Sequence, residues 1–570
     1  MKKSDEYMPW SKYLTPNANN LVYPDYSVYK HLETTAESHL NAKAYNYFGK
    51  KVTFKKYLKQ IDRCARAFKK LGVQKGEYVS ICMANTPEAI ISFYALNKIG
   101  AVANMIHPLS AENEIKYYLN VSDSKYVVTI DASFNKINHI VADTKIKNII
   151  LVAASKSMPK WLEVGYDAKK FVEHSLEYNS CTIKWKKFMK LGKKYKEEII
   201  DEGVGEDVCA ILYSGGTSGD PKGIMLTNYN FNAEAINSVE ACTHLEVGDR
   251  CLAILPIFHA FGLGVCIHTV QSFGGCSVLI PQFNAKQFHK LLKKYKANII
   301  IGVPTLFEAM LNNKELQKFD FSKLKLLISG GDNLSVSLKK KVDDFIQSHG
   351  ANIQVREGYG LTESTGASCL TPYSDYRAGS IGIPYPGMYY KIVKPGTNKE
   401  LKYGKEGEII ISGPTVMKGY LKDQELTKKT LIPDKNGRIW LHTGDVASMD
   451  EDGFVYFKQR IKRMIVSSGY NVYPQYIENI IESHPDVSYC CVIGIPHPYK
   501  VQVAKAFIVL KSGVPESDKT LESIKELCKK NLARYSWPSE YEFRDKLPKT
   551  LVGKVAYHKL ELEEEKKLNK

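Results

Sequence analysis

The sequence lacks the features that mark membrane-spanning, secreted and covalent-intermediate proteins. It has no run of 18 apolar residues, so no segment is expected to cross a bilayer. The opening residues, MKKSDEYMPWSKYL, carry three lysines but no apolar core, so we expect no secretory signal peptide there. Internal repeats and low-complexity linkers are missing too. A G-x-S-x-G or Cys/His signature of a covalent nucleophile is also absent.

Paired cysteine motifs are absent as well. The 12 cysteines are scattered without a C-x-x-C spacing, which predicts reduced thiols in a cytoplasmic protein rather than disulfides or a zinc site. Cys490 and Cys491 are adjacent, and we expect them to point to opposite faces of one strand.

Acidic residues are fewer than basic ones: the chain has 61 acidic and 79 basic residues, which gives a net charge of +18. Because the lysines are spread along the chain, we read this as a lysine-rich surface and expect no nucleic-acid partner. Residues 183–196, IKWKKFMKLGKKYK, contain seven lysines and no acid. Two readings stay open for them: a solvated face, or peripheral contact with a membrane surface.

The length and the order of apolar runs predict an α/β protein of several domains. A chain of 570 residues is too long to fold around a single hydrophobic core. Short apolar runs alternate with amphipathic segments such as Phe54–Leu71 and Asn284–Tyr295, as in doubly wound α/β layers. The runs are Tyr78–Met83, Ile149–Ala153, Val278–Ile280, Ile299–Val303 and Leu324–Ser329. Residues 380–457 predict a β-rich subdomain, and a compact α+β tail follows Arg460.

The most informative segment is YSGGTSGDPKG, Tyr213 to Gly223. An apolar strand, Val208–Tyr213, precedes a loop rich in glycine and hydroxyl groups, which suits a polyphosphate. The spacing fails the usual P-loop pattern because Lys222 follows Pro221. The segment taken alone is therefore either a phosphate loop or a plain turn.

Four ordered motifs together resemble the adenylate-forming superfamily of acyl-CoA synthetases, luciferases and nonribosomal adenylation domains. The further motifs are REGYGLTES (356–364), WLHTGDV (440–446) and PKTLVGK (548–554). The segment 72–101 also looks like the family's opening, so the likeness covers the whole chain. The resemblance implies a large domain of residues 1–459 and a mobile C-terminal lid, 460–570, with a hinge near residues 460–463.

The resemblance also assigns roles in the activation of a carboxylic acid by ATP. Lys554 matches the catalytic lysine that bridges acyl oxygen and phosphate. Glu363 would hold Mg²⁺ with the phosphates, Thr362 would reach the α-phosphate, and Tyr359 would offer its ring to adenine. His259, in LPIFHAFG, would stand beside the carboxylate, although an isolated histidine is more often a core residue.

The remaining nucleotide and CoA contacts follow from the same motifs. Asp445 and Arg460 would bind the ribose, and Gly331, Asp332 and Asn333 would touch adenine and the acyl pocket. SGGDNLS superficially resembles a carrier-protein motif, but Asn333 stands where the modified serine should be, so we reject that reading. Ser468 and Gly469 would lie along the pantetheine arm. The other predicted contacts are Ser214, Gly215, Gly216, Thr217, Ser218, Gly219, Lys222, Gly358, Gly360 and Lys462.

Two positions depart from the family pattern. Arg463 replaces the aspartate of R-x-K-D at the hinge, and Tyr557-His558 replaces the common R-R pair after Lys554. The first puts the rate of lid movement in question, and the second puts contacts with CoA or the lid in question.

We therefore predict an ATP-dependent ligase that joins a medium- or long-chain fatty acid to coenzyme A through acyl-AMP. The amino-acid-activating branch of the superfamily places an aspartate near here to pair the substrate's amine, and residues 256–258 offer none, so the resemblance implies a simple carboxylate rather than an amino acid. The sequences GVPTLFEAM (302–310) and SSGYNVYP (467–474) look most like fatty-acyl-CoA ligases. The alternatives are an aryl or steroid-type carboxylate, a carrier protein as acceptor, and an inactive nucleotide- or acyl-CoA-binding relative. A homodimer is also left open.

Overall fold

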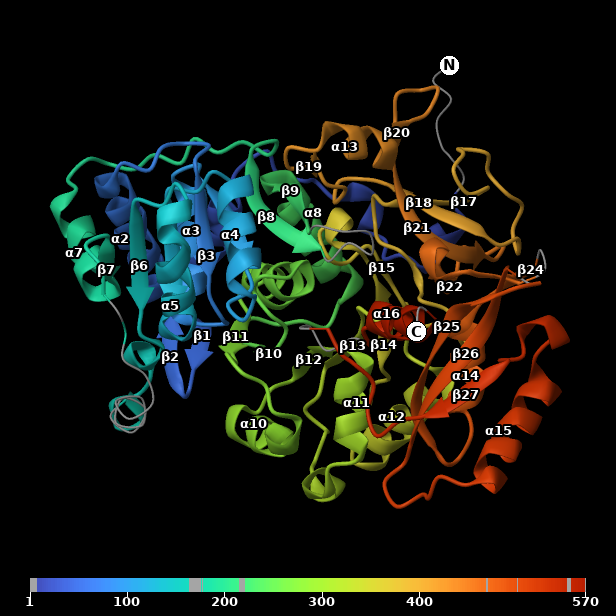
Figure 1. The fold of residues 1–570 in the computed structure, drawn as a ribbon. Helices are drawn as coiled ribbons and strands as arrows, with labels where there is room; N and C mark the ends of the chain where they lie inside the picture. Colours follow the sequence, from blue (N-terminus) through green and yellow to red (C-terminus); the bar gives the residue numbers. More distant parts are fainter. Residues whose placement is uncertain are drawn as a thin grey trace.

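Two large sheets with helices between and around them form the body of the molecule (Figure 1). The structure is a computed structural model that describes residues 8–163, 176, 178–214, 221–467, 470–499, 501–550 and 555–568. The first sheet has eight strands in the order β19-β9-β8-β4-β3-β5-β6-β7. Their bounds are Gly419–Tyr420, Lys222–Thr227, Val208–Ser214, Val102–Ile106, Tyr78–Cys82, Tyr126–Ile130, Asn148–Val152 and Thr182–Lys184.

The second sheet has nine strands in the order β16-β15-β14-β13-β12-β10-β11-β1-β2. Their bounds are Ile383–Pro384, Cys369–Leu370, Arg356–Tyr359, Leu326–Ser329, Ile299–Gly302, Arg250–Ala253, Cys276–Leu279, Lys43–Tyr47 and Lys50–Thr53. The five strands from β11 to β14 run parallel, so their carboxyl ends lie along one edge, where α/β proteins place ligands.

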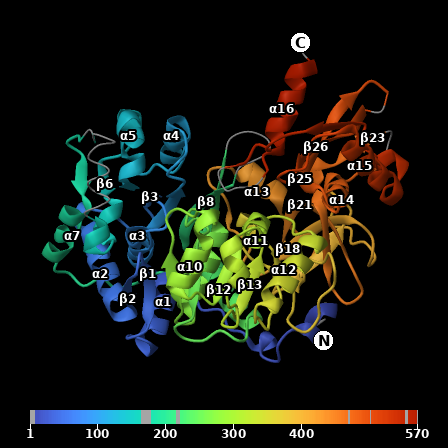
Figure 2. The same cartoon turned by 90° about the horizontal axis from the view of Figure 1, so that it is seen from below.

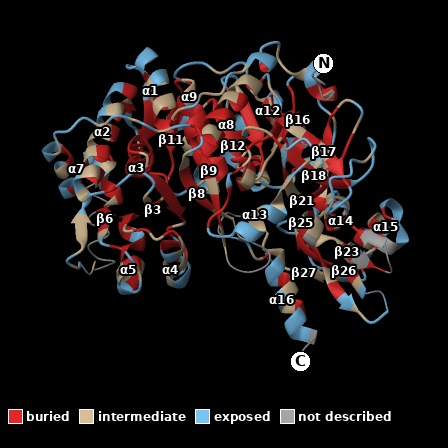
Figure 3. Ribbon diagram, turned by 90° about the horizontal axis from the view of Figure 1, so that it is seen from above, coloured by how far each residue is buried: buried red, intermediate tan, exposed pale blue. Residues whose placement is uncertain are grey.

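The helices between the sheets are nearly all buried. Every residue of α3 (Pro87–Lys98) is buried, and most of α8 (Asn228–Ala241) is too, as the red ribbons of Figure 3 show. Helix α1 (Val28–Ser38) contacts both of them and α9 (Val270–Ser272). A nine-residue π-helix, η5 (Phe261–Thr269), packs on α8. On the outer face of the second sheet lie α10 (Phe288–Tyr295), α11 (Pro304–Leu311) and α12 (Val336–Ser348) (Figure 2).

The helices at the periphery of the molecule are amphipathic, with one side buried. Helix α2 spans Phe54–Leu71, as predicted; Thr53 caps its start and Gly72 ends it with a left-handed φ of 93°. The lysine-rich segment forms β7 and α7 (Trp185–Lys194). Its apolar side packs on α2, with the Phe188 and Phe68 ring centroids 4.9 Å apart. Any membrane contact of α7 would therefore involve its lysines rather than an inserted apolar face.

A β-rich subdomain occupies the segment where short strands were predicted. It contains β17 (Tyr389–Val393), β18 (Gly407–Ser412), β21 (Ile439–Met449), β20 (Leu431–Pro433) and β22 (Val455–Arg460). Strand β19 differs from that prediction, because Gly419 and Tyr420 pair with Met225 and Ile224 of β9 and so join the first sheet. This pairing carries Tyr420 toward the loop between β8 and β9.

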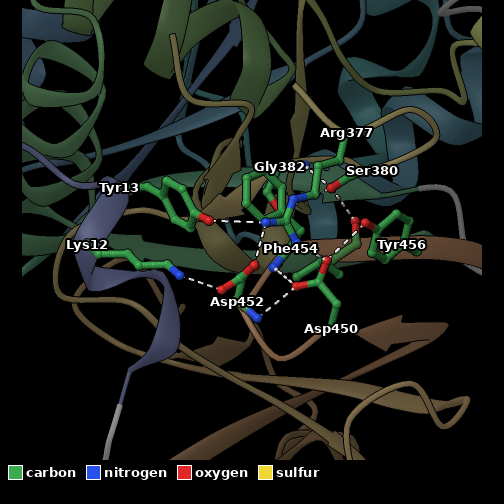
Figure 4. Close-up of polar contacts among 10 residues, drawn as sticks. Lys12, Tyr13, Arg377, Ser380, Gly382, Asp450, Asp452, Phe454 and Tyr456 are labelled. Atoms are coloured by element: carbon green, nitrogen blue, oxygen red, sulfur yellow. Dashed lines mark hydrogen bonds and ion pairs between the residues drawn. The ribbon is translucent and has the colours of Figure 1, made fainter. Parts of the chain in front are cut away.

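A cluster of charged and aromatic side chains ties the N-terminal segment to this subdomain (Figure 4). Arg377 donates from Nη1 to Asp450 at 2.6 Å and also bonds Asp452, while Lys12 pairs with Asp452. The Arg377 guanidinium carbon lies 4.1 Å from the centroid of the Phe454 ring. Because these side chains are partly exposed and screened by solvent, the ion pairs contribute little to stability.

The C-terminal domain is a separate α+β layer. Its sheet contains β24 (Tyr470–Val472), β23 (Ile465–Ser467), β26 (Val501–Leu510), β25 (Val487–His497) and β27 (Glu540–Phe543). Helices α14 (Pro474–Glu482) and α15 (Asp518–Asn531) cover one face and α16 (Tyr557–Leu568) the other. Cys490 packs with the first group and Cys491 with the second, which confirms their predicted opposite orientation.

The α/β architecture with a β-rich subdomain and a small α+β domain confirms the predicted fold class. All 12 cysteines are free thiols, and 11 of them are buried. Within the described part of the chain, no helix combines the length and the apolar character that crossing a membrane requires.

Candidate functional site

Three predicted nucleotide contacts meet where β14, β21 and β22 approach each other. The Tyr359 hydroxyl donates to Asp445 Oδ2 at 2.7 Å, and Arg460 Nε lies 3.5 Å from Asp445 Oδ1. Asp445 and Arg460 are register partners on β21 and β22. The Asp445 side chain is 2% exposed, whereas that of Arg460 is 48% exposed. A buried carboxylate therefore stands beside an accessible cation.

The negative charge of Asp445 favours the protonated forms of both Arg460 and Tyr359. The Asp445 carboxylate raises the pKa of the Arg460 guanidinium, with smaller contributions from Tyr359, Tyr557 and Glu363. Burial, followed by the Asp445 charge, raises the pKa of the Tyr359 hydroxyl well above its ordinary value. Arg460 therefore stays cationic and Tyr359 neutral over the physiological range.

Glu363 and Thr362 lie in a short turn, η8 (Thr362–Ser364), directly after β14. The turn is packed tightly: a Cβ on Gly360 would stand 2.2 Å from the Gly366 carbonyl oxygen, so the position requires glycine. Thr362 is buried, and the half-buried Glu363 accepts a hydrogen bond from the Tyr420 hydroxyl at 3.1 Å. Gly358 belongs to β14 and pairs with Leu370.

The glycine-rich loop connects β8 to β9. Ser214 and Lys222 are register partners at its two ends. Lys222 Nζ lies 5.5 Å from the centroid of the Tyr420 ring, so the loop ends close to Glu363. The predicted contacts Gly215, Gly216, Thr217, Ser218 and Gly219 lie outside the described residues, as do Ser468, Gly469 and Lys554. Lys462 is described only by its backbone, in η9 (Ile461–Arg463).

The loop after β13 links the two domains. Gly331 takes a left-handed φ of 77°, and Asp332 Oδ1 accepts a hydrogen bond from the Asn333 backbone N–H at 2.9 Å. Asn333 Nδ2 donates to Asn479 Oδ1 on α14 at 3.0 Å. The predicted nucleotide and acyl loop therefore contacts the C-terminal domain.

His259 lies two residues before the π-helix η5, beside the same loop. Its Nδ1 accepts a hydrogen bond from the Phe261 N–H at 3.3 Å. A Cβ on Gly330 would stand 3.0 Å from the Phe261 ring, so this segment and the end of β13 are in close contact. π-Helical turns often occur at functional sites.

Two residues that the motif reading missed also shape the site. Tyr420 bridges Glu363 and Lys222, and only its pairing with β9 reveals this. Asn85 holds the LPIFH segment: its Nδ2 donates to the Ala253 and Leu255 carbonyls at 2.8 Å, and its Oδ1 accepts from Ile257 N–H at 2.9 Å. Asn85 follows the apolar run Tyr78–Met83 and belongs to none of the four motifs, so reasoning from the sequence overlooked it.

The two departures from the family pattern meet in space. The Arg463 guanidinium carbon lies 4.8 Å from the centroid of the Tyr557 ring. Arg463 Nη2 also donates to Glu478 Oε1 at 2.5 Å and to the Val492 carbonyl at 3.2 Å. Arg463 is therefore held within the C-terminal domain, by α14, β25 and the start of α16.

The donor set fits a magnesium nucleotide better than a protein-only metal site. Within the described residues, no three His, Cys, Asp or Glu side chains converge to hold a metal ion. A single carboxylate, Glu363, near Lys222 is the arrangement in which Mg²⁺ takes most of its ligands from phosphates and water.

Comparison with known proteins identifies the family to which this chain belongs. Residues 32–421 match the model of the AMP-binding enzyme family, and residues 476–554 match the model of its C-terminal domain. A long-chain-fatty-acid–CoA ligase of Bacillus subtilis (strain 168) is 31% identical, with 98% of each chain covered. A ligase of the same name from Escherichia coli O6:H1 is 32% identical over 93% of each chain.

Solved structures agree. ATP-bound MatB from Rhodopseudomonas palustris superimposes with a TM-score of 0.81 at 25% identity, covering 95% of this chain and 99% of that one. The Mycobacterium tuberculosis fatty acyl CoA synthetase gives 0.69 at 26%, also covering 95% and 99%. The chain therefore belongs to the AMP-binding enzyme family, as its motifs predicted.

Proposed function

We propose that the protein joins a medium- or long-chain fatty acid to coenzyme A at the expense of ATP, through an acyl-adenylate. The enzyme class is that of the AMP-forming acid–thiol ligases. The observation that carries the proposal is the convergence of Tyr359, Asp445, Arg460 and Glu363 at one edge of the second sheet. The fatty-acid ligases at 31–32% identity support the acyl class.

In the first step the carboxylate oxygen attacks the α-phosphorus of ATP, and pyrophosphate leaves. Catalysis of this displacement is positioning together with fixed positive charge. We assign adenine to the Tyr359 ring, the ribose hydroxyls to Asp445 and Arg460, and the phosphates to Lys222, Thr362 and the loop 214–219. Mg²⁺ bound with Glu363 would neutralise charge on the phosphates.

Two further groups act at the reacting centre in this proposal. Lys554 bridges the acyl oxygen and the α-phosphate, and His259 stands beside the incoming carboxylate. Removing one fixed donor of this type costs about 10²–10³ in rate.

In the second step the CoA thiol attacks the acyl carbonyl and AMP leaves. We assign the pantetheine arm to Ser468 and Gly469. The proposal divides the chain into an N-terminal domain, 1–459, and a C-terminal lid, 460–570, that turns near residues 460–463. The Asn333–Asn479 hydrogen bond joins the two domains and would break in such a movement, whereas Arg463 is bonded within the lid and would move with it.

The test is release of AMP and pyrophosphate with ATP and Mg²⁺ across fatty, aryl and steroid-type acids, with and without CoA. Lys554→Ala is the control for the active site. AMP that requires both CoA and a C8–C18 fatty acid supports the proposal. Pyrophosphate without CoA, and unchanged when CoA is added, indicates another acceptor such as a carrier protein. Absence of turnover with every acid contradicts the proposal.

A further inference from the structure

A short segment, residues 417–421, connects the two halves of the proposed phosphate site. Met417 N–H donates to the Glu363 carbonyl at 2.9 Å, in the turn η8 that follows the second sheet. Leu421 N–H donates to the Gly223 carbonyl at 2.7 Å, on strand β9 of the first sheet. The same five residues therefore contact both the turn and the strand that follows the glycine-rich loop.

Tyr420 is fixed within this segment. It pairs with Ile224 of β9, and its N–H donates to Thr427 Oγ1 at 2.9 Å. Gly419, the preceding residue, has a φ of 147°, and a Cβ there would stand 2.8 Å from the Thr427 side chain. Tyr420 itself is only 6% exposed. The backbone and its neighbours therefore leave the Tyr420 side chain little freedom to move.

Two side chains of opposite charge contact Tyr420 at different places. The hydroxyl donates to Glu363 Oε1 at 3.1 Å, and the Lys222 ammonium lies 5.5 Å from the ring centroid. Among the residues that the structure describes, neither Lys222 nor Glu363 takes part in an ion pair. Tyr420 therefore contacts the carboxylate and the ammonium separately, and the two charges do not neutralise each other.

The hydrogen bond from Tyr420 determines which carboxylate oxygen remains for another ligand. A phenol keeps its proton at neutral pH, so the hydroxyl donates to Glu363 Oε1. Within the described ranges no second donor reaches this carboxylate, so Oε2 keeps its lone pairs for a cation. Mg²⁺ requires near-ideal geometry and takes few ligands from the protein, so the orientation of a single carboxylate matters. Hydrogen bonds of this type commonly orient the carboxylates that bind metals.

The ring contact keeps Lys222 apart from the same carboxylate. A lysine and a glutamate that face one site would otherwise attract each other, and incoming phosphates would have to separate them. The face of a tyrosine ring attracts an ammonium without cancelling its charge. Lys222 therefore keeps its full charge for an anionic ligand.

We propose that Tyr420 is a positioning residue of the phosphate site. Its hydroxyl orients the Glu363 carboxylate toward Mg²⁺, and its ring holds Lys222 out of an ion pair with that carboxylate. This inference rests on the proposed function, because that function assigns Mg²⁺ to Glu363 and the phosphates to Lys222.

The test is the factor by which Mg²⁺ raises the affinity for ATP, measured by calorimetry with Mg²⁺ and with a chelator. We call this ratio the Mg²⁺ factor. Tyr420→Phe keeps the ring and removes the hydroxyl. We expect its Mg²⁺ factor to fall about fivefold, because a hydrogen bond to a charged group is lost, while the affinity for metal-free ATP stays that of wild type.

Tyr456→Phe is the matched control. The Tyr456 hydroxyl also donates to a carboxylate, Asp450 Oδ2, at 3.0 Å, but in the cluster of Figure 4 rather than at the phosphate site. The Mg²⁺ factor of this variant should equal that of wild type. A hydroxyl with a merely structural role would change the thermal stability of Tyr420→Phe and leave its Mg²⁺ factor unaltered, which would overturn the proposal.

A double variant tests whether Tyr420 acts through Glu363. Glu363→Gln should lower the Mg²⁺ factor on its own, and the further change Tyr420→Phe should then have no additional effect. A fall of the same size in both backgrounds would show that the hydroxyl acts elsewhere.

The ring is tested by pentafluorophenylalanine at position 420. This residue has nearly the shape of phenylalanine, but its ring face no longer attracts a cation. Metal-free ATP should therefore bind about two- to fivefold more weakly than to Tyr420→Phe, because Lys222 is no longer held apart from Glu363. Equal affinities in the two variants would overturn the role of the ring.

Failure of this inference and failure of the proposed function give different results. A Mg²⁺ factor that depends on Glu363 but is the same in wild type and Tyr420→Phe overturns the positioning role alone. ATP binding that Mg²⁺ does not strengthen, or a Mg²⁺ factor that Glu363→Gln leaves unchanged, contradicts the assignment of Glu363 and this inference with it. No turnover of any acid by wild type contradicts the proposed function itself.

Discussion

The two ends of the site are built on different principles. At the nucleotide end, Tyr359, Asp445 and Arg460 bond directly to one another, and short motifs carry them. At the proposed acyl end, the residues come from separate parts of the chain: His259 precedes η5, and the Phe261 ring lies against Gly330, which follows β13. On the proposed assignments, local motifs encode the chemistry shared by all substrates, and packing across the sheet determines which acid is accepted.

The largest effect is expected at the nucleotide end, from Glu363→Gln. Loss of the carboxylate removes the proposed Mg²⁺ contact, so kcat/KM should fall about 10²–10³. The loss should be the same for every acid in the panel, measured as AMP release. Glu425→Gln, an exposed change on α13 (Gln424–Thr430), is the control. A loss that varies with chain length would break the separation between the two ends.

Asp445→Asn should have the next largest effect. It removes the negative charge that Arg460 faces and weakens the bond from Tyr359, so the KM for ATP should rise about 10–100-fold. Tyr359→Phe removes only the hydroxyl and should raise it less. The preference among acids should not change in either variant. An unaltered KM for ATP in Asp445→Asn would contradict the ribose assignment.

A buried carboxyl between α8 and η5 should make the stability of the protein depend on pH. Glu234 on α8 accepts hydrogen bonds from Ser238 at 2.8 Å and from Thr269 of η5 at 3.0 Å. Burial raises the pKa of Glu234 from 4.5 to about 7. The folded state therefore binds more protons than the unfolded state between these values, and the free energy of unfolding falls as pH rises through that window.

Replacing that carboxyl should remove this pH dependence. In Glu234→Gln the decrease in unfolding free energy between pH 5 and 8, about 1–3 kcal/mol for this group, should be lost. Denaturant unfolding at several pH values measures it, with Glu425→Gln as control. A decrease of the same size in wild type and Glu234→Gln would mean that the carboxyl does not titrate in this range.

The smallest effect is expected at the proposed hinge, which would serve both ends equally. Arg463→Asp and Tyr557→Arg should each slow CoA-dependent thioester formation about 3–10-fold, because each puts like charges together beside Glu478 or Arg463. The double variant sets a carboxylate opposite a guanidinium and should recover part of the rate. ATP–pyrophosphate exchange, which reports the first step, should change less than thioester formation. Additive losses in the double variant would show that the two residues do not act together.

The sequence predicted the fold class because that depends on local patterns, and the motifs proposed for the nucleotide end are local as well. The apolar runs correspond to β3, β6, β11, β12 and β13, and Phe54–Leu71 has the bounds of α2. Tyr420 escaped prediction because its place follows from a two-residue pairing with β9. The roles of the individual site residues remain predictions.

One measurement tests the central claim that the two ends bind two parts of one acyl-adenylate. It is a crystal structure of the protein with the adenosine sulfamate of decanoic acid. The account predicts adenine against Tyr359, the ribose hydroxyls on Asp445, and the acyl carbonyl beside His259. An acyl group away from His259, or a ribose away from Asp445, would contradict it.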